Sequence, residues 1–162
     1  MSDRPWPTAA AFLADEIASF RPFEAILGLA ARDLDTGGQA HGWSARDLLS
    51  HLVGGHEVAT EVAGELRTSP TSVRKAVADA DWDARADAIN EEIREAWSRL
   101  PIDDFRSRAR SATAALRSAL AEVPIEHWWE SEEYFDYFNS EMVAHYDDHR
   151  ADLDQVLGRQ AG

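Results

Sequence analysis

Hydrophobic residues recur every three or four positions through most of this chain, which is the spacing of an amphipathic α-helix. Runs of alternating β-branched residues bounded by turn residues, which would indicate strands, do not occur in the sequence. The pattern therefore predicts an all-α protein. The main helices are expected at about 8–27, 45–65, 86–100, 105–123 and 131–157.

The ends of these helices carry residues that favour starting or stopping a helix. Thr8 and Ser44 have side chains that accept a hydrogen bond from the backbone of a first turn, so each is expected to be an N-cap. Pro22 lies inside the first helical pattern and should kink or break it. The polar stretch 33–42 contains glycines and predicts a loop, and Gly158 is the expected end of the last helix.

The segment 67–83 has the weakest helical pattern in the chain. Pro70 indicates a connection, and 72–80 is expected to form a short extra helix. The prediction is thus a helical bundle with an additional helical insertion between its second and third helices. The last helix is expected to run without interruption over 131–157.

Two histidines of the last helix form the first part of a candidate metal site. His145 and His149 are four residues apart, so a helix would place both imidazoles on one face, about one turn apart. The same face carries Phe138, Met142 and Val156, so we expect both rings to point into the bundle. The alternative is that each imidazole is hydrogen-bonded inside the core without a metal.

The third candidate ligand is His51, which lies among leucines of the second helix. An imidazole buried there without a polar partner would be costly, and a metal shared with His145 and His149 would supply the partner. Gly54 and Gly55 follow, although each glycine costs about 1 kcal/mol in a helix interior. Close packing or open space beside His51 would explain them, and a close helix crossing alone is the alternative.

Three neutral imidazoles favour a divalent transition metal, zinc or nickel above all, over magnesium or calcium. Three protein ligands leave coordination positions open for water or substrate, as in catalytic sites. Asp47 and Glu141 each precede a candidate ligand by one turn and are candidates to accept hydrogen bonds from the histidine rings. An ordinary solvated acid is the alternative for each.

Tyr134 is the candidate catalytic residue. On a continuous last helix it shares the face of His145, so its hydroxyl could reach a substrate above the metal; the alternative is a tyrosine of the core or its rim. The other three histidines, His41, His56 and His127, are placed outside the set of ligands because of their positions on loops or on other helix faces.

The composition excludes several classes of function. A formal net charge of -14 disfavours nucleic acid and anionic lipid as partners. No stretch approaches the roughly 20 apolar residues of a membrane span, and the N-terminus does not resemble a signal peptide, so a cytoplasmic protein is expected. The absence of cysteine excludes a thiol nucleophile in the chain itself. A single domain over 1–162 is expected, and the composition is typical of a high-GC bacterium.

Two segments together suggest a family. The sequence GWSARDLLSHL at 42–52, followed by HYDDH at 145–149, resembles the DinB-like metalloprotein superfamily. The stretch around Asn90 and the histidine ending look most similar to the ClbS/DfsB group, with mycothiol-dependent maleylpyruvate isomerase N-terminal domains as relatives. The resemblance implies an up-down-down-up four-helix bundle and gives the metal-ligand role to His51, His145 and His149.

The resemblance implies a metal-dependent enzyme acting on a reactive electrophilic small molecule. This would be either a thiol-dependent transferase or isomerase, with mycothiol as a cosubstrate, or a protective hydrolase similar to ClbS that serves detoxification. The residues Gly54, Gly55 and His56 depart from the ClbS-like pattern. The alternative is a non-catalytic protein that binds or sequesters a small molecule and has structural histidines. The sequence leaves a homodimer open.

Overall fold

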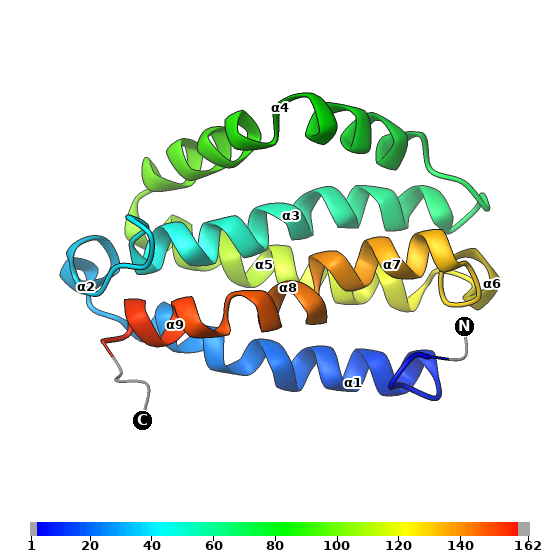
Figure 1. Cartoon of the computed structure of the whole chain (residues 1–162), viewed down its shortest axis with the longest axis horizontal. Helices are drawn as coiled ribbons and strands as arrows, with labels where there is room; N and C mark the ends of the chain where they lie inside the picture. The colour runs from blue at the N-terminus through cyan, green and yellow to red at the C-terminus, as the bar shows by residue number, and fades with distance from the viewer. Residues whose placement is uncertain (1–2, 159–162) are drawn as a thin grey trace.

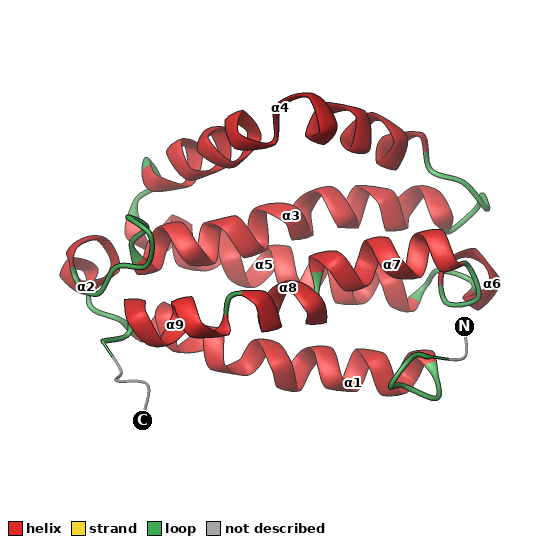
Figure 2. Ribbon diagram, viewed as in Figure 1, coloured by secondary structure: helices red, strands yellow, loops and turns green. Residues whose placement is uncertain are grey.

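The computed structural model describes residues 3–158, and these form helices joined by short connections (Figure 2). Within this range, extended pairing is limited to an isolated bridge between Ala40 and Trp43. The predicted all-α class is confirmed. The elements are α1 (Ala9–Phe20), the 3-10 helix η1 (Arg21–Gly28), α2 (Ala31–Thr36), α3 (Ala45–Leu66), α4 (Val73–Ser98), α5 (Ile102–Ala121), α6 (Ile125–Trp128), α7 (Glu132–Glu141), α8 (Val143–Asp148) and α9 (Arg150–Val156).

The bundle is formed by α1, α3, α5 and the series α7 to α9, which lie alongside one another (Figure 1). The helix α3 lies at the centre and packs against α5, α4, α2, α7 and α9. The helix α4 arches over α3 on the outside of the bundle and carries the chain back, so that α3 and α5 run in the same direction (Figure 1). No helix among residues 3–158 has the length and apolar character needed to cross a lipid bilayer.

The helix starts follow the predicted caps. The Thr8 hydroxyl accepts a hydrogen bond from the Ala11 backbone N–H at 3.1 Å, and α1 begins at the next residue. At the start of α3, the Ser44 hydroxyl accepts from the Asp47 N–H and the Asp47 carboxylate accepts from the Ser44 N–H, both at 3.1 Å. An N-cap of this kind is worth about 1 kcal/mol. These hydrogen bonds fix the residue at which α3 begins, and with it the position of His51 along the helix.

The chain before α3 follows the prediction at one point and differs from it at another. The first helix is broken at Pro22, as predicted: α1 ends at Phe20 and the chain continues as the 3-10 helix η1. The predicted loop 33–42 is wrong in its first part, where α2 extends to Thr36. The reason is tertiary: Leu34 is fully buried, and the packing of its side chain holds a helical turn in a polar stretch.

The region between α3 and α5 contains the two predicted helices, but they meet at a kink without an intervening loop and form the single element α4. The kink is at Arg85, which has φ -155° and ψ 45°. The Arg85 guanidinium bonds Asp81 at 2.7 Å on one side of the kink and Glu92 at 2.6 Å on the other. Of all its residues α4 buries only Lys75 and Trp97, which explains its weak apolar pattern.

The predicted continuous helix 131–157 is also wrong, because it is divided into three. Met142 has φ -120° and ψ -109°, and His149, with φ -105° and ψ 8°, separates α8 from α9. At the first break the Asn139 side-chain oxygen accepts a hydrogen bond from the Ala144 N–H at 3.3 Å, where a regular helix would use a carbonyl. The side chain of Met142 is fully buried, and Tyr146 of α8 reaches the interior of the bundle.

Buried polar side chains hold α8 in this position. The Tyr146 hydroxyl donates to Glu16 Oε1 of α1 at 2.9 Å, and Arg117 of α5 donates to the same carboxylate at 2.6 and 3.1 Å. His56 Nε2 of α3 lies 2.9 Å from the Tyr146 oxygen, and its Nδ1 lies 3.1 Å from the Thr113 hydroxyl of α5. One network therefore joins four helices.

The direction of each hydrogen bond in this network follows from the chemistry of its members. An ionised carboxylate only accepts, so the single hydroxyl proton of Tyr146 goes to Glu16. His56 must then carry its proton on Nε2 and donate it to the Tyr146 oxygen, which leaves Nδ1 to accept from Thr113. Burial lowers the pKa of His56 to about 3, so this imidazole is neutral near pH 7. Every member is satisfied in this single arrangement.

Candidate metal centre

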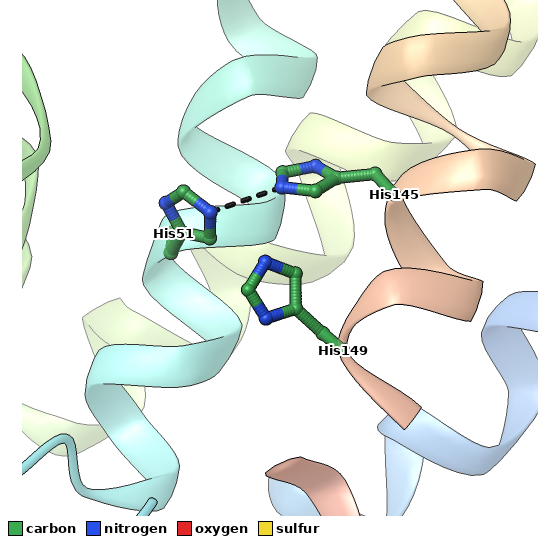
Figure 3. A group of neighbouring side chains, drawn as sticks. All are labelled: His51, His145 and His149. Atoms are coloured by element: carbon green, nitrogen blue, oxygen red, sulfur yellow. Dashed lines mark hydrogen bonds between the residues drawn. The ribbon is translucent and has the colours of Figure 1, made fainter. Parts of the chain in front are cut away.

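The three histidines predicted to bind metal lie together (Figure 3). His51 comes from the middle of α3, His145 from α8, and His149 from the residue that separates α8 from α9. One ring nitrogen from each lies within 4.8 Å of those of the other two. The His51 and His145 Nε2 atoms are 2.9 Å apart. The spacing of the sequence thus identified a set of residues that the fold brings to one point.

A divalent transition metal fits this set of nitrogens. Zinc binds imidazole nitrogen at about 2.0–2.1 Å. Two nitrogens bound to one ion are therefore separated by no more than twice this distance, and the 4.8 Å within which the three ring nitrogens lie is close to that separation. The 2.9 Å contact between the Nε2 atoms of His51 and His145 also fits a hydrogen bond between two neutral imidazoles, which was the alternative expected from the sequence. His145 Nδ1 is buried and has no hydrogen-bond partner among the described residues in either arrangement.

The surroundings of the cluster keep the imidazoles of His51 and His145 neutral, which is the form that binds a metal. Burial lowers the pKa of His51 to about 4, and the neighbouring His149 adds to this effect, while a hydrogen bond with the Asn90 side chain opposes it. Burial, together with His51 and His149, lowers the pKa of His145 to about 3. At neutral pH these rings are uncharged, so no proton has to be displaced from their lone pairs.

The orientation of His149 depends on Asp152, a residue that the sequence analysis did not select. His149 Nδ1 donates to Asp152 Oδ2 at 2.8 Å, which leaves Nε2 as the free lone pair. The other carboxylate oxygen of Asp152 lies 3.1 Å from His41 Nε2. His41 has a left-handed φ of 54° in the loop before α3. The signal available in the sequence was an acid three residues after a candidate ligand.

The side chain of Trp43 covers one side of the cluster and was also missed. Its ring centroid lies 4.8 Å from that of His51 and 6.5 Å from that of His149, in a stacked arrangement with the latter. The bridge between Ala40 and Trp43 holds this loop in place through two backbone hydrogen bonds of 2.9 Å. The indole therefore shields the histidines from water on this side.

On another side His51 and His145 border a cavity of about 540 Å³ beneath α4. This volume suits a small-molecule ligand. Helix α3 forms the floor, α4 the roof, and α7 one wall. The lining residues are His51, Gly54, Gly55, Val58, Arg74, Ala78, Asp79, Asp81, Trp82, Ile89, Asn90, Ile93, Tyr137, Ser140, Glu141 and His145.

The two glycines after His51 shape this cavity in different ways. A Cβ atom on Gly54 would lie 2.7 Å from the Cγ2 atom of Ile93, so this glycine permits α4 to pack closely on α3. A Cβ atom on Gly55 would lie 2.2 Å from Glu141 Oε2. Close packing thus explains the first glycine, and the second makes room for a carboxyl group from α7.

The two acids predicted to orient the histidines are placed differently. Asp47 caps α3 through Ser44, and its carboxylate accepts from that backbone N–H. Glu141 lines the cavity beside His145, but its side chain forms no hydrogen bond with either ring among residues 3–158. Burial, with a smaller effect of the Asp79 charge, raises the pKa of Glu141 to about 7. Its carboxyl group can therefore hold or release a proton near neutral pH.

The position of Tyr134 does not match the predicted catalytic role. Its hydroxyl accepts a hydrogen bond from the Ser72 backbone N–H at 2.7 Å, and Tyr134 is not among the residues that line the cavity. The prediction assumed a continuous last helix, and the break at Met142 removes the common face on which it depended. Tyr137, one turn later, lines the cavity instead.

Comparisons with known proteins place the chain in a family. Neither the curated proteins nor the solved structures gave a match. The family model described as the mycothiol maleylpyruvate isomerase N-terminal domain matches residues 13–133, about three quarters of the chain. The match includes His51 and ends before His145. It supports the DinB-like superfamily, while the finer grouping with ClbS/DfsB stays a prediction. The chain belongs to the mycothiol maleylpyruvate isomerase N-terminal domain family.

Proposed function

We propose that this protein is a metal-dependent enzyme that uses a low-molecular-weight thiol against an electrophilic small molecule, as a thiol-dependent isomerase or transferase. The observation that carries this proposal is the convergence of three imidazole nitrogens, within 4.8 Å of one another, beside a cavity of about 540 Å³. A fully enclosed structural site would have no such space beside its ligands.

Each residue of the site has a distinct part in this proposal. His51, His145 and His149 would hold the ion, zinc or nickel. When bound, such an ion lowers the pKa of a thiol or water and so supplies a nucleophile at neutral pH. Asp152 fixes the ring of His149 through the 2.8 Å hydrogen bond. Glu141, whose pKa burial raises to about 7, can take a proton from a reactant or return it at its carboxyl oxygen.

The thiol must come from outside the chain, because the sequence contains no cysteine. The description of the matching family names mycothiol, and we take this as the first cosubstrate to test. The substrate carbon would be an electrophilic one, such as that of an activated alkene or an epoxide. A water molecule in place of the thiol would make the protein a hydrolase of the same class of substrate.

The test is the dependence of turnover on metal and thiol. Protein purified without an affinity tag should carry about one transition-metal ion per chain, and a panel of electrophiles should be consumed only when both the metal and mycothiol are present. The variant His145→Ala should lose metal and activity, whereas His127→Ala, whose ring contacts the Leu66 carbonyl at 2.7 Å, should keep both.

The other outcomes select between the alternatives. Metal-dependent turnover without thiol would assign a protective hydrolase. Tight retention of a ligand with no turnover would assign a sequestration protein with structural histidines. Full metal content in His145→Ala would contradict the metal site itself.

A further inference from the structure

We propose that the cavity beside the histidines selects a substrate whose end facing Glu141 and Asp79 is cationic or an uncharged hydrogen-bond donor, and that it rejects a carboxylate there. This inference rests on the proposed function, because it concerns the molecule that fills the same cavity. The proposed substrate class differs from the substrate that the family description names, because maleylpyruvate is a dicarboxylate.

The charged groups that line the cavity are mostly acidic. Asp79, Asp81 and Glu141 contribute three carboxyl groups, whereas Arg74 is the only basic side chain among the lining residues that the structure describes. The guanidinium of Arg74 is already engaged, because its Nε donates to Glu61 Oε2 at 2.6 Å. A substrate carboxylate would have to compete with Glu61 for this cation.

The basic partner of Asp79 does not cancel the acidic charge. Lys75 Nζ lies 2.6 Å from Asp79 Oδ2 and 3.3 Å from Glu133 Oε1, so one ammonium group is shared by two carboxylates. The carboxylates of these pairs are exposed to solvent, where water and salt weaken their electric field without reversing its sign. An excess of negative charge therefore stays near this part of the wall.

The same sharing occurs at the kink of α4. Arg85 Nε lies 2.7 Å from Asp81 Oδ1, and its Nη1 lies 2.6 Å from Glu92 Oε1. One guanidinium again serves two carboxylates. The segments of α4 on both sides of the kink thus carry more acidic than basic groups. An anionic end of a ligand placed beneath them would be repelled.

Glu141 is the acid available to a ligand. Its side chain has no hydrogen-bond or ion-pair partner among residues 3–158, and its carboxyl oxygen occupies the space left by Gly55. A ligand ammonium or hydroxyl group would give this carboxyl group the partner that the protein does not provide. An ammonium group would also favour its ionised form.

The rest of the cavity surface is apolar. Val58, Ile89, Ile93 and the ring of Trp82 line it together with the charged groups. The body of the ligand is therefore expected to be partly apolar. The substrate class that fits is a small electrophile with a hydrocarbon or aromatic body and an amine or hydroxyl group at the end that faces Glu141.

The experiment compares three probes of similar shape, benzylamine, benzyl alcohol and benzoate, on the metal-free full-length protein. Binding is followed by NMR through the backbone amides of Gly54 and Gly55, which line the cavity. Benzylamine should bind at least about tenfold more tightly than benzoate, because a unit charge several ångströms away near a protein surface changes an equilibrium constant by about that factor. Benzyl alcohol should lie between them.

Two variants assign the effect to its source. Glu141→Gln should reduce the preference for benzylamine over benzoate severalfold. Glu57→Gln, a matched change on α3 at a residue that pairs with Arg108 and does not line the cavity, should leave the preference unchanged. Equal or tighter binding of benzoate, an unchanged preference in Glu141→Gln, or no amide shift with any probe would each overturn the proposal.

A parallel measurement tests the proposed function separately. Cobalt-loaded protein is titrated with 2-mercaptoethanol, and thiolate binding is read from the thiolate-to-cobalt charge-transfer absorption. Absence of this band would contradict the thiol-dependent function. The probe titration on metal-free protein would still decide the charge preference of the cavity, so the two failures are distinguishable.

Discussion

Replacing Tyr146 with phenylalanine should destabilise the bundle by about 3 kcal/mol, although it removes a single oxygen atom. The hydroxyl is fully buried and lies 2.9 Å from both Glu16 Oε1 and His56 Nε2. The ring of phenylalanine fills the same space, so the change creates almost no cavity. The expected effect is therefore one of hydrogen bonding and not of packing.

The magnitude follows from the two bonds that are lost. The hydrogen bond to the charged carboxylate of Glu16 is worth about 1.5–3 kcal/mol, and a buried N–H left without an acceptor on His56 costs about 1–3 kcal/mol. The free energies of these two neighbouring hydrogen bonds do not simply add, so we expect about 3 kcal/mol in total. A change of tautomer cannot relieve the loss, because Thr113 satisfies only one ring nitrogen, at 3.1 Å.

Urea denaturation of the metal-free protein at pH 7.5 measures this effect, with an unchanged dependence on denaturant showing that both proteins unfold alike. The matched control is Tyr137→Phe, nine residues earlier, whose hydroxyl has no hydrogen-bond partner among residues 3–158. That variant should change the free energy of unfolding by less than about 1 kcal/mol. Equal effects of the two substitutions would refute the network.

Other expected outcomes concern pH, metal and backbone packing. Burial lowers the pKa values of His51, His56 and His145 to about 4, 3 and 3, so only the unfolded chain takes up these protons, and thermal melts of metal-free protein should show stability falling as pH drops below about 6.5. Glu141, with its pKa raised to about 7, acts oppositely, because its contribution is lost as pH rises from about 4.5, so it reduces the slope without reversing it. Added zinc should raise the melting temperature of the wild type and leave that of His145→Ala unchanged. Gly38→Ala should unfold more easily by about 2 kcal/mol or more in urea, because its Cβ would lie 2.2 Å from a backbone oxygen of α9; an unchanged midpoint would contradict this.

The parts of the fold that could be predicted are those set by local chemistry. Ser44 and Asp47 specify the start of α3 by bonds between residues three apart, and the apolar period then places His51 towards the interior. The spacing of His145 and His149 identified the other two candidate ligands although the family match ends at residue 133. In each case the information lies within one or two helical turns of the sequence.

The errors have a common cause in contacts between distant residues. Met142 fits the apolar period of a continuous helix, and nothing local indicates that the chain breaks there. The break depends on Tyr146 reaching Glu16, which is 130 positions away in the sequence. For this reason Tyr134 lies outside the lining of the cavity. Asp152 is an exception, because an acid three residues after His149 is a local signal that the sequence already contains.

The small number of residues that α4 buries has a consequence for how this protein can diverge. Helix α4 buries two residues, whereas α3 buries thirteen, so substitutions in α4 disturb few core contacts. The three candidate ligand histidines lie on α3, on α8 and just after α8, outside this roof, while Asp79 and Asp81 of the cavity lie on α4 and Glu141 lies on α7. Evolution or design can therefore change much of the cavity lining through α4, while the three histidines and most of the buried core of the bundle stay the same.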